Sequence, residues 1–183
     1  MKWNDHSRLE GSHAFLGASQ FHWLNYDEKK LIERWQSAEA IKRGTELHEY
    51  AANAIKLGIW QRDTGHTLEQ HINDAIGFGL DPEVVLYYSE FCYGTSDAIG
   101  FKNDLLRIHD LKTGKIKAHM QQLYIYAALF CLEYSVKPGE IQMETRIYQN
   151  NEIFIDNPTA ETILPIMNII KKYSKILSDI KND

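Results

Sequence analysis

Residues 94–115 read GTSDAIGFKNDLLRIHDLKTGK, and this stretch predicts two strands joined by a tight turn. β-branched and aromatic residues stand on both sides of KND at 102–104, a tripeptide typical of a hairpin turn. Asp97 then falls at the end of one strand, and Asp110 falls at the end of its partner. Residues two apart on a strand face the same side, so Asp110 and Lys112 project together. Asp97 can meet them across the hairpin.

These three side chains predict a site for a divalent cation. Two carboxylates and an amine are costly to bury together unless they share a task. Asp97 and Asp110 could hold one or two hard cations, and Lys112 could position an attacking water or stabilise developing negative charge. Phosphodiester hydrolysis is a reaction that uses all three groups. The plain alternative is an exposed Asp-x-Lys ion pair, which occurs by chance in many proteins.

The part of the chain before this hairpin shows helical spacing. Ser37 is expected to cap a helix over 38–58, with the terminal glycine of that range as its stop. A further helix is expected over 68–78, ending near Gly79. His48 falls on the core side of the first helix, together with the other residues at helical spacing, which are Ile41, Gly44, Leu47, Ala51, Ala54 and Ile55.

The part of the chain after the hairpin predicts a buried helix, two more strands and a last helix. Residues 118–135 are mostly apolar and favour a helix, and 141–149 with 152–156 favour a second hairpin around Asn150-Asn151. The tail over 159–180 is amphipathic, with one face formed by Ile163, Ile166, Ile170, Tyr173 and Ile176. This order of elements indicates an α/β or α+β core with a sheet flanked by helices.

Length, composition and charge limit the class of protein. A chain of 183 residues suits one domain, and 44% hydrophobic with 25% charged residues is typical of a soluble globular protein. No apolar run is long enough for a membrane span, and the N-terminus lacks the long apolar stretch that a secretory signal would need, so none is expected. Cys92 and Cys131 are expected to be buried free thiols, so a cytoplasmic location is expected. A net charge of −5 argues against coating of nucleic acid through overall charge but leaves room for a local basic track.

Four motifs in order resemble the RecB-like branch of the PD-(D/E)XK nuclease superfamily. GTSDAIG followed by LLRIHDLKTGK is similar to its paired acid motifs, and QLYIYAALF at 122–130 resembles its Q-x-x-x-Y motif. RGTELHE at 43–49 resembles the helix motif that carries a glycine and a metal-binding histidine. Together they span residues 43–130. SHAFLGASQFHWLNY at 12–26 also looks like the leading segment of phage exonucleases related to lambda exonuclease.

The resemblance implies a cation site with Mg²⁺ or Mn²⁺ as the cofactor. The ligands that it implies are His48, Asp97, Asp110 and the backbone carbonyl of Leu111. The alternative for His48 is a core histidine with both ring nitrogens satisfied. Two cysteines cannot supply the thiolates of an iron–sulfur cluster, so no cluster is expected.

The same resemblance makes Lys112 the catalytic lysine. Gln122 and Tyr126 lie one helical turn apart and would support this lysine or touch the substrate strand, although packing of the helix on a sheet also explains them. The chain departs from the superfamily pattern at two positions. Ser96 stands where the named proline is found, and the second acid is Asp110 rather than glutamate.

The fold implied by the resemblance is a restriction-endonuclease-like α/β core. A central mixed β-sheet would be flanked by helices in three layers, with helical additions at the N-terminus. The whole chain, 1–183, would form a single nuclease domain, with a mostly helical part over 1–80 and the sheet-containing catalytic core over 83–183.

The expected activity is hydrolysis of DNA phosphodiesters, most specifically by an exonuclease in phage-type recombination or repair. An endonuclease or nickase is one alternative, and a nucleic-acid-binding protein that has the fold without the activity is another. The sequence lacks a phosphate-binding GxxxxGK[ST] loop, so an ATP-driven partner would be a separate chain. A separate recombination or single-strand-binding protein and a homo-oligomer are further possibilities.

Contacts with DNA are expected at Ser19, Arg43, Lys115 and Lys117. For the two lysines a solvated basic loop is an equal alternative. Trp23 could stack on a DNA end, although core packing is the plainer role for a tryptophan.

Overall fold

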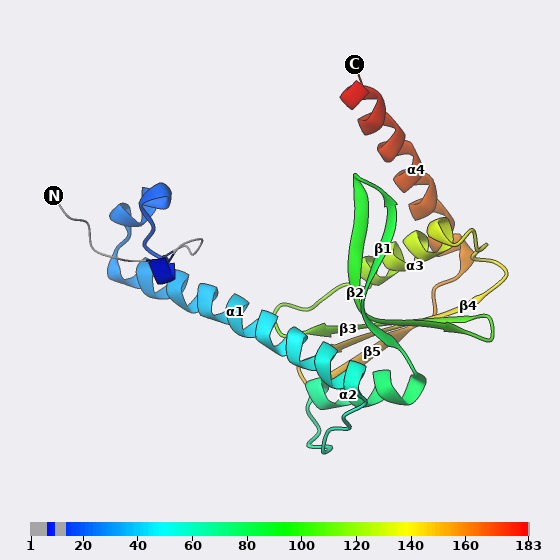
Figure 1. Ribbon diagram of the computed structural model, residues 1–183, viewed down its shortest axis with the longest axis horizontal. Coiled ribbons are helices and arrows are strands. Elements are labelled where there is room, and N and C mark those ends of the chain that lie inside the picture. Colours follow the sequence, from blue (N-terminus) through cyan, green and yellow to red (C-terminus); the bar gives the residue numbers. More distant parts are fainter. Residues whose placement is uncertain (1–6, 10–13, 183) are drawn as a thin grey trace. The chain divides into compact units, whose positions relative to one another are not determined.

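A five-stranded mixed sheet in the order β1-β2-β3-β4-β5 forms the framework of the unit that begins at Gly44 (Figure 1). The computed structural model describes residues 7–9 and 14–182. Its elements are η1 (Ser7–Leu9), η2 (Ala18–Asn25), α1 (Glu28–Leu57), α2 (Thr67–Phe78), β1 (Asp81–Ser89), β2 (Cys92–Lys102), β3 (Leu105–Lys112), α3 (Gln121–Glu133), β4 (Gln142–Gln149), β5 (Glu152–Asp156) and α4 (Ala160–Asn182). The expected α/β class and the order of strands and helices after residue 80 are confirmed.

The sheet combines three antiparallel pairs with one parallel pair. β1–β2, β2–β3 and β4–β5 are antiparallel, whereas β3 and β4 run parallel and are joined through α3. Two of the hairpins turn at Asn103-Asp104 and Asn150-Asn151, all four residues having φ between 52° and 62°. Positive φ at both central residues is what a two-residue hairpin turn requires, and Asn and Asp tolerate it best. Both predicted turns are therefore confirmed.

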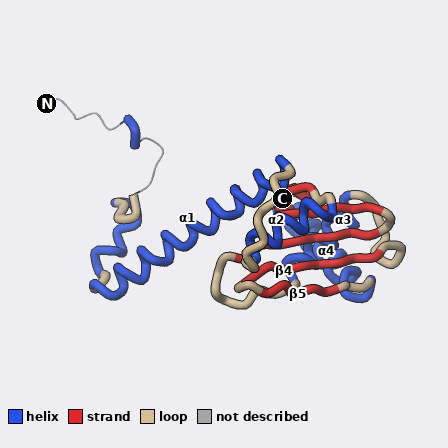
Figure 2. Tube along the Cα trace, turned by 90° about the horizontal axis from the view of Figure 1, so that it is seen from below, coloured by secondary structure: helices blue, strands red, loops and turns tan. Residues whose placement is uncertain are grey.

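Helices cover both faces of the sheet, with α2 on one side of it and α3 and α4 on the other in Figure 1; Figure 2 gives the view from below. On one face, α3 and α4 pack over a core that includes Leu106, Ile108 and Ile147. On the other face, α2 and the second half of α1 pack over Leu111 and Tyr148. Neighbouring residues of β3 and β4 thus alternate between the two cores, as the pleat of a strand demands.

The start of α1 differs from the expectation. The helix begins at Glu28 rather than after Ser37, and the Asp27 carboxylate accepts a hydrogen bond from the Lys30 N–H at 2.7 Å. Ser37 lies inside the helix, where its hydroxyl donates to the Glu33 carbonyl. Serine can bond back to the preceding turn in this way, so its presence does not require a helix start. The helix ends at Leu57, and Gly58 follows with φ 65°, so the predicted stop is confirmed.

The buried stripes of the outer helices also differ in detail. On α1, Gly44, Ala51, Ala54 and Ile55 are buried as expected, but Ile41 is exposed. On α4, Ile163 and Ile170 are buried as expected, whereas Tyr173 and Ile176 are exposed. Ser174 takes the inward position, and its hydroxyl lies 2.9 Å from that of Ser89. The predicted stripe therefore holds only for the first half of α4.

The unit up to Arg43 contains η2 and the first part of α1. The Trp23 indole N–H donates to the Gly17 carbonyl at 2.9 Å, and Phe15 and Trp35 meet edge to face with ring centroids 5.1 Å apart. Trp23 is half-buried, so its ring supports this local packing. That both units belong to one domain stays a prediction.

Both cysteines are free thiols. Cys131, on α3, is buried in the core, while Cys92 is only half-buried, so the expected burial is confirmed for Cys131 alone. Within the described residues, every helix is too short or too polar to cross a lipid bilayer.

A polar network is buried between α2 and the sheet. The Tyr148 hydroxyl donates to Asp74 Oδ2 at 2.7 Å, and the Arg146 guanidinium donates to the same oxygen at 3.1 Å. The His71 ring meets the Tyr148 ring edge to face and is 1% exposed. Burial lowers the pKa of His71 to about 4, so the imidazole is neutral in the folded protein at pH 7.

This buried histidine should make the free energy of unfolding depend on pH. The unfolded chain takes up the proton below pH about 6.5, whereas folded His71 takes it only near its pKa of about 4. Stability therefore falls as the pH drops between these values. We expect the free energy of unfolding of wild type, relative to His71→Phe, to fall by about 2 kcal/mol between pH 7 and pH 5. Urea titrations at both pH values measure it, and a constant difference would contradict it.

Candidate active site

Strands β2 and β3 separate beside Asp97. Their pairing extends only as far as Ala98↔His109, and beyond that pair β2 continues alongside β1. At the point of separation, the Leu111 N–H donates to Asp97 Oδ2 at 2.8 Å, so a side chain takes the place of the strand partner. Asp97 therefore lies inside β2, where it leaves β3, and not at the end of a strand as expected.

Helix α1 brings His48 to this carboxylate. His48 Nδ1 lies 3.2 Å from Asp97 Oδ2, and the two side chains are 30% and 17% exposed. Gly44, one helical turn earlier, permits the close approach, because a Cβ there would come within 2.9 Å of Thr113 Oγ1. His48 is thus half-exposed and paired with an acid, which does not fit a core histidine.

Helix α3 holds Lys112 through a chain of hydrogen bonds. Lys112 Nζ lies 2.9 Å from Asp110 Oδ2 and donates to Gln122 Oε1 at 2.7 Å. Gln122 Nε2 donates to the Tyr126 hydroxyl at 3.0 Å, which donates in turn to the Thr95 carbonyl at 2.6 Å. The structure therefore connects the three predicted residues Lys112, Gln122 and Tyr126 and ties them back to β2.

The pKa values of the two carboxylates are shifted in opposite directions. Burial and the neighbouring Asp97 charge raise the pKa of Asp110 to about 6, although Lys112 opposes this. Burial also acts to raise the pKa of Asp97, but the hydrogen bond and charge of His48 outweigh it, and this pKa is lowered. The hydrogen bond to Asp97 raises the pKa of His48. Asp97 is therefore the more acidic member of the pair.

Side chains with oxygen and nitrogen donors for a divalent cation lie around this point of separation. The N–H and carbonyl of one strand residue face the same neighbour, so the Leu111 carbonyl lies on the Asp97 side of β3. Among residues 7–9 and 14–182, no three His, Cys, Asp or Glu side chains form a ready metal-binding group. Instead, Asp97 is engaged by His48 and Asp110 by Lys112.

Glu83 on β1 is an acidic residue near the site that sequence reasoning missed. β1 and β2 pair at Pro82↔Ala98 and at Val84↔Ser96, which places Glu83 opposite Asp97. Burial and the Asp97 charge raise the pKa of Glu83, and His48 opposes them. Only the pairing register of β1 on β2 reveals this neighbour, so no local motif could have identified it.

Gln149, at the end of β4, is a second residue that the motifs did not reveal. Its side chain is 2% exposed and its amide donates to the carbonyls of Gly114 and Ile116 at 2.6 and 2.7 Å. Its carbonyl accepts the Ala118 N–H at 2.9 Å. One buried side chain thus shapes the loop that follows Lys112.

The predicted DNA contacts fall in two places. Lys115 and Lys117 are exposed in the loop held by Gln149, and Lys117 Nζ lies 5.4 Å from the centroid of the Phe154 ring. Ser19 and Arg43 belong to the unit up to Arg43, where both side chains are exposed. The exposure of all four leaves their role in DNA binding a prediction.

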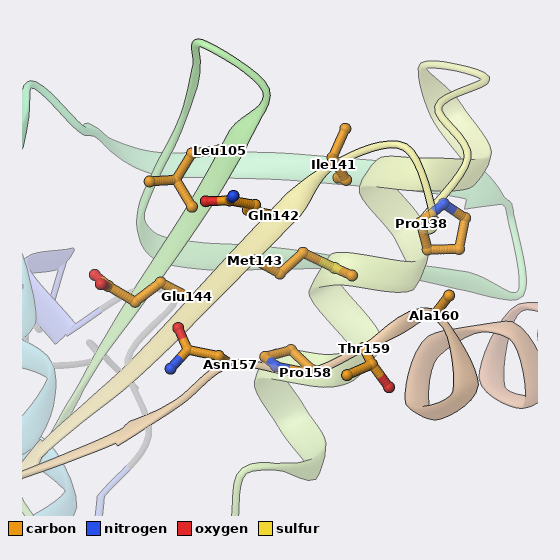
Figure 3. Close-up of a pocket in the computed structure, with 11 residues that line it drawn as sticks. Leu105, Pro138, Ile141, Gln142, Met143, Glu144, Asn157, Pro158, Thr159 and Ala160 are labelled. Atoms are coloured by element: carbon orange, nitrogen blue, oxygen red, sulfur yellow. The ribbon is translucent and has the colours of Figure 1, made fainter.

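An open groove elsewhere on the sheet does not share this chemistry (Figure 3). It lies by the first residues of β3 and β4, between Leu105 and Pro158, whereas Asp110 and Lys112 lie at the opposite end of β3. Its one ionisable lining residue, Glu144, accepts hydrogen bonds from Arg146 and from Arg107.

Comparisons with models of known protein families, with curated proteins and with solved structures give no match to this chain. The resemblance to RecB-like nucleases is therefore carried by the motifs themselves.

Removing the Gln149 side chain should loosen the loop after Lys112. We expect Gln149→Ala to destabilise the protein by about 2–3 kcal/mol, because three part-buried hydrogen bonds between this side chain and the loop are lost. We also expect faster tryptic cleavage after Lys115 and Lys117. Gln142→Ala, an exposed glutamine on the same strand, is the matched control. Equal cleavage rates in the two variants would contradict a role for Gln149 in holding the loop.

Proposed function

We propose that this chain is a Mg²⁺- or Mn²⁺-dependent deoxyribonuclease with a restriction-endonuclease-like core of the RecB-like type. One observation carries the proposal. Asp97, Asp110 and Lys112 meet where β2 leaves β3, His48 reaches them from α1, and Gln122 reaches them from α3. Chance Asp-x-Lys pairs are usually exposed, whereas the Asp110 side chain here is 2% exposed.

The donor set fits a hard divalent cation. Asp97 and Asp110 offer carboxylate oxygens, Leu111 offers its carbonyl and His48 offers an imidazole nitrogen that also suits Mn²⁺. The buried Asp110 carboxylate contacts Lys112 Nζ at 2.9 Å through Oδ2 and at 3.2 Å through Oδ1. A bound cation would supply charge neutralisation at the phosphate and a lowered pKa for its water.

The residues of the chain then position the reaction. In hydrolysis, a water oxygen bonds to phosphorus, the ester P–O bond breaks, and the leaving oxygen takes up a proton. Lys112 places a positive charge beside the buried acid, where it can stabilise charge growing on the phosphate oxygens. Gln122 and Tyr126 fix the ammonium position through hydrogen bonds anchored on β2.

Among the modes of cleavage, an exonuclease of phage-type recombination or repair is the specific proposal. It is supported by the resemblance of residues 12–26 to phage exonucleases and by the absence of a nucleotide-binding loop from the sequence. The partner is DNA, with a separate recombination or single-strand-binding protein and self-association as further proposals. An endonuclease, and a binding protein without activity, are the alternatives.

Cleavage of two DNA forms tests the activity and its mode together. We expect end-labelled linear duplex to be degraded in Mg²⁺ or Mn²⁺ but not in EDTA, while closed circular duplex is spared. Asp110→Asn should lose about 10²–10³-fold in rate, because it removes a charge from the cation site. Glu152→Gln, an exposed acid on β5, is the matched control.

The alternatives give different results. Cutting of the circular DNA would replace the exonuclease with an endonuclease. Failure to cut either form, with DNA still bound, would favour the inactive binding protein.

The lysine should act on catalysis more than on binding. We expect Lys112→Ala to lower the cleavage rate about 10²–10³-fold with DNA affinity changed less than about threefold, because a single phosphate contact adds little. Fluorescence anisotropy in Ca²⁺ would measure binding, and Lys102→Ala at the far end of β2 is the control. Cleavage retained by Lys112→Ala would remove this residue from the catalytic set.

A further inference from the structure

We propose that Glu83 is a further carboxylate ligand of the cation site. This inference rests on the proposed function, because it adds a residue to the same site. Glu83 is not part of any motif in the sequence. Its position follows from how β1 pairs with β2.

The register of the two strands places Glu83 across from Asp97. The flanking pairs, Pro82↔Ala98 and Val84↔Ser96, are both formed, and the pair between them is missing. Opposite residues of an antiparallel pair have their Cβ atoms about 4.5–5.5 Å apart. The register on both sides therefore keeps Glu83 beside Asp97, although the two residues do not themselves pair.

The backbone of Glu83 supports a special role. Its φ is 52°, in the left-handed region that residues with a Cβ avoid. Among the described non-glycine residues outside the two hairpin turns, only Ser135 shares a positive φ. A strained residue inside a strand persists only where the surrounding structure holds it, and such residues gather at functional sites.

The charges around Glu83 favour a cation. Glu83 lies opposite Asp97, which already contacts His48, while the buried Asp110 contacts Lys112, so three carboxylates stand beside a single ammonium and one imidazole. Glu83 is exposed and, within the described part of the chain, forms neither a hydrogen bond nor an ion pair. It is free to turn its carboxylate onto an ion that Asp97 also binds.

Titration of the protein with Mn²⁺ in a calorimeter tests this directly. We expect Glu83→Gln, which keeps the size and removes the charge, to weaken Mn²⁺ binding about 10-fold or more. Asp110→Asn should also weaken it, and Glu152→Gln should leave it unchanged. Unaltered affinity in Glu83→Gln, with weakened binding in Asp110→Asn, would overturn the role of Glu83 and leave the proposed function standing. A wild-type protein that binds no Mn²⁺ would overturn both.

A second pair of variants separates ligation from folding. Glu83→Gly relieves the positive φ, so its melting temperature in EDTA should rise while Mn²⁺ affinity falls as in Glu83→Gln. Ser135→Gly relieves the other positive φ, far along the chain, and should raise the melting temperature with Mn²⁺ affinity unchanged. An equal loss of Mn²⁺ affinity in both glycine variants would overturn the assignment.

Discussion

The hydrogen bond from the Leu111 N–H to the Asp97 carboxylate is the constraint on which the site depends. β2 serves two partners, β1 over its first part and β3 over its last part, so the end of β3 loses its neighbour beyond Ala98↔His109. A backbone N–H in such a place must find another acceptor. Because Asp97 supplies it at 2.8 Å, its carboxylate is held at the end of β3 that also carries Asp110. A requirement of the sheet thus brings two acids together.

The proposed site receives side chains from the helices on both faces of the sheet. His48 comes from α1, which packs on one face, and Gln122 comes from α3, which packs on the other. Each layer delivers or fixes one nitrogen-bearing side chain, His48 against Asp97 and Lys112 against Asp110. The sheet supplies the acids. This division explains how a buried carboxylate such as Asp110 is tolerated, since its charge is met by an ammonium that a whole helix helps to position.

Local patterns were enough to predict what depends on neighbours in the sequence. Strand alternation, the Asn-rich turns and the i, i+4 spacing of Gln122 and Tyr126 act over a few residues. What depends on distant segments could not be predicted. Glu83 joins the site only through the register of β1, Gln149 shapes a loop 31–35 residues before it, and Ser174 replaces Tyr173 as the inward residue of α4. Ser37 gave a wrong helix start because a serine inside a helix can also donate to the carbonyl of the preceding turn.

Two unfavourable features of the molecule lie beside the proposed site. Glu83 holds a left-handed φ within a strand, and Asp110 is a carboxylate that is only 1% exposed. Each would be relieved by a simple substitution, a glycine at the first position or an apolar residue at the second. The two apolar cores on either face of the sheet supply the stability that lets both persist. A fold selected for stability alone has no use for either feature, whereas a cation bound between the carboxylates would turn both into favourable interactions.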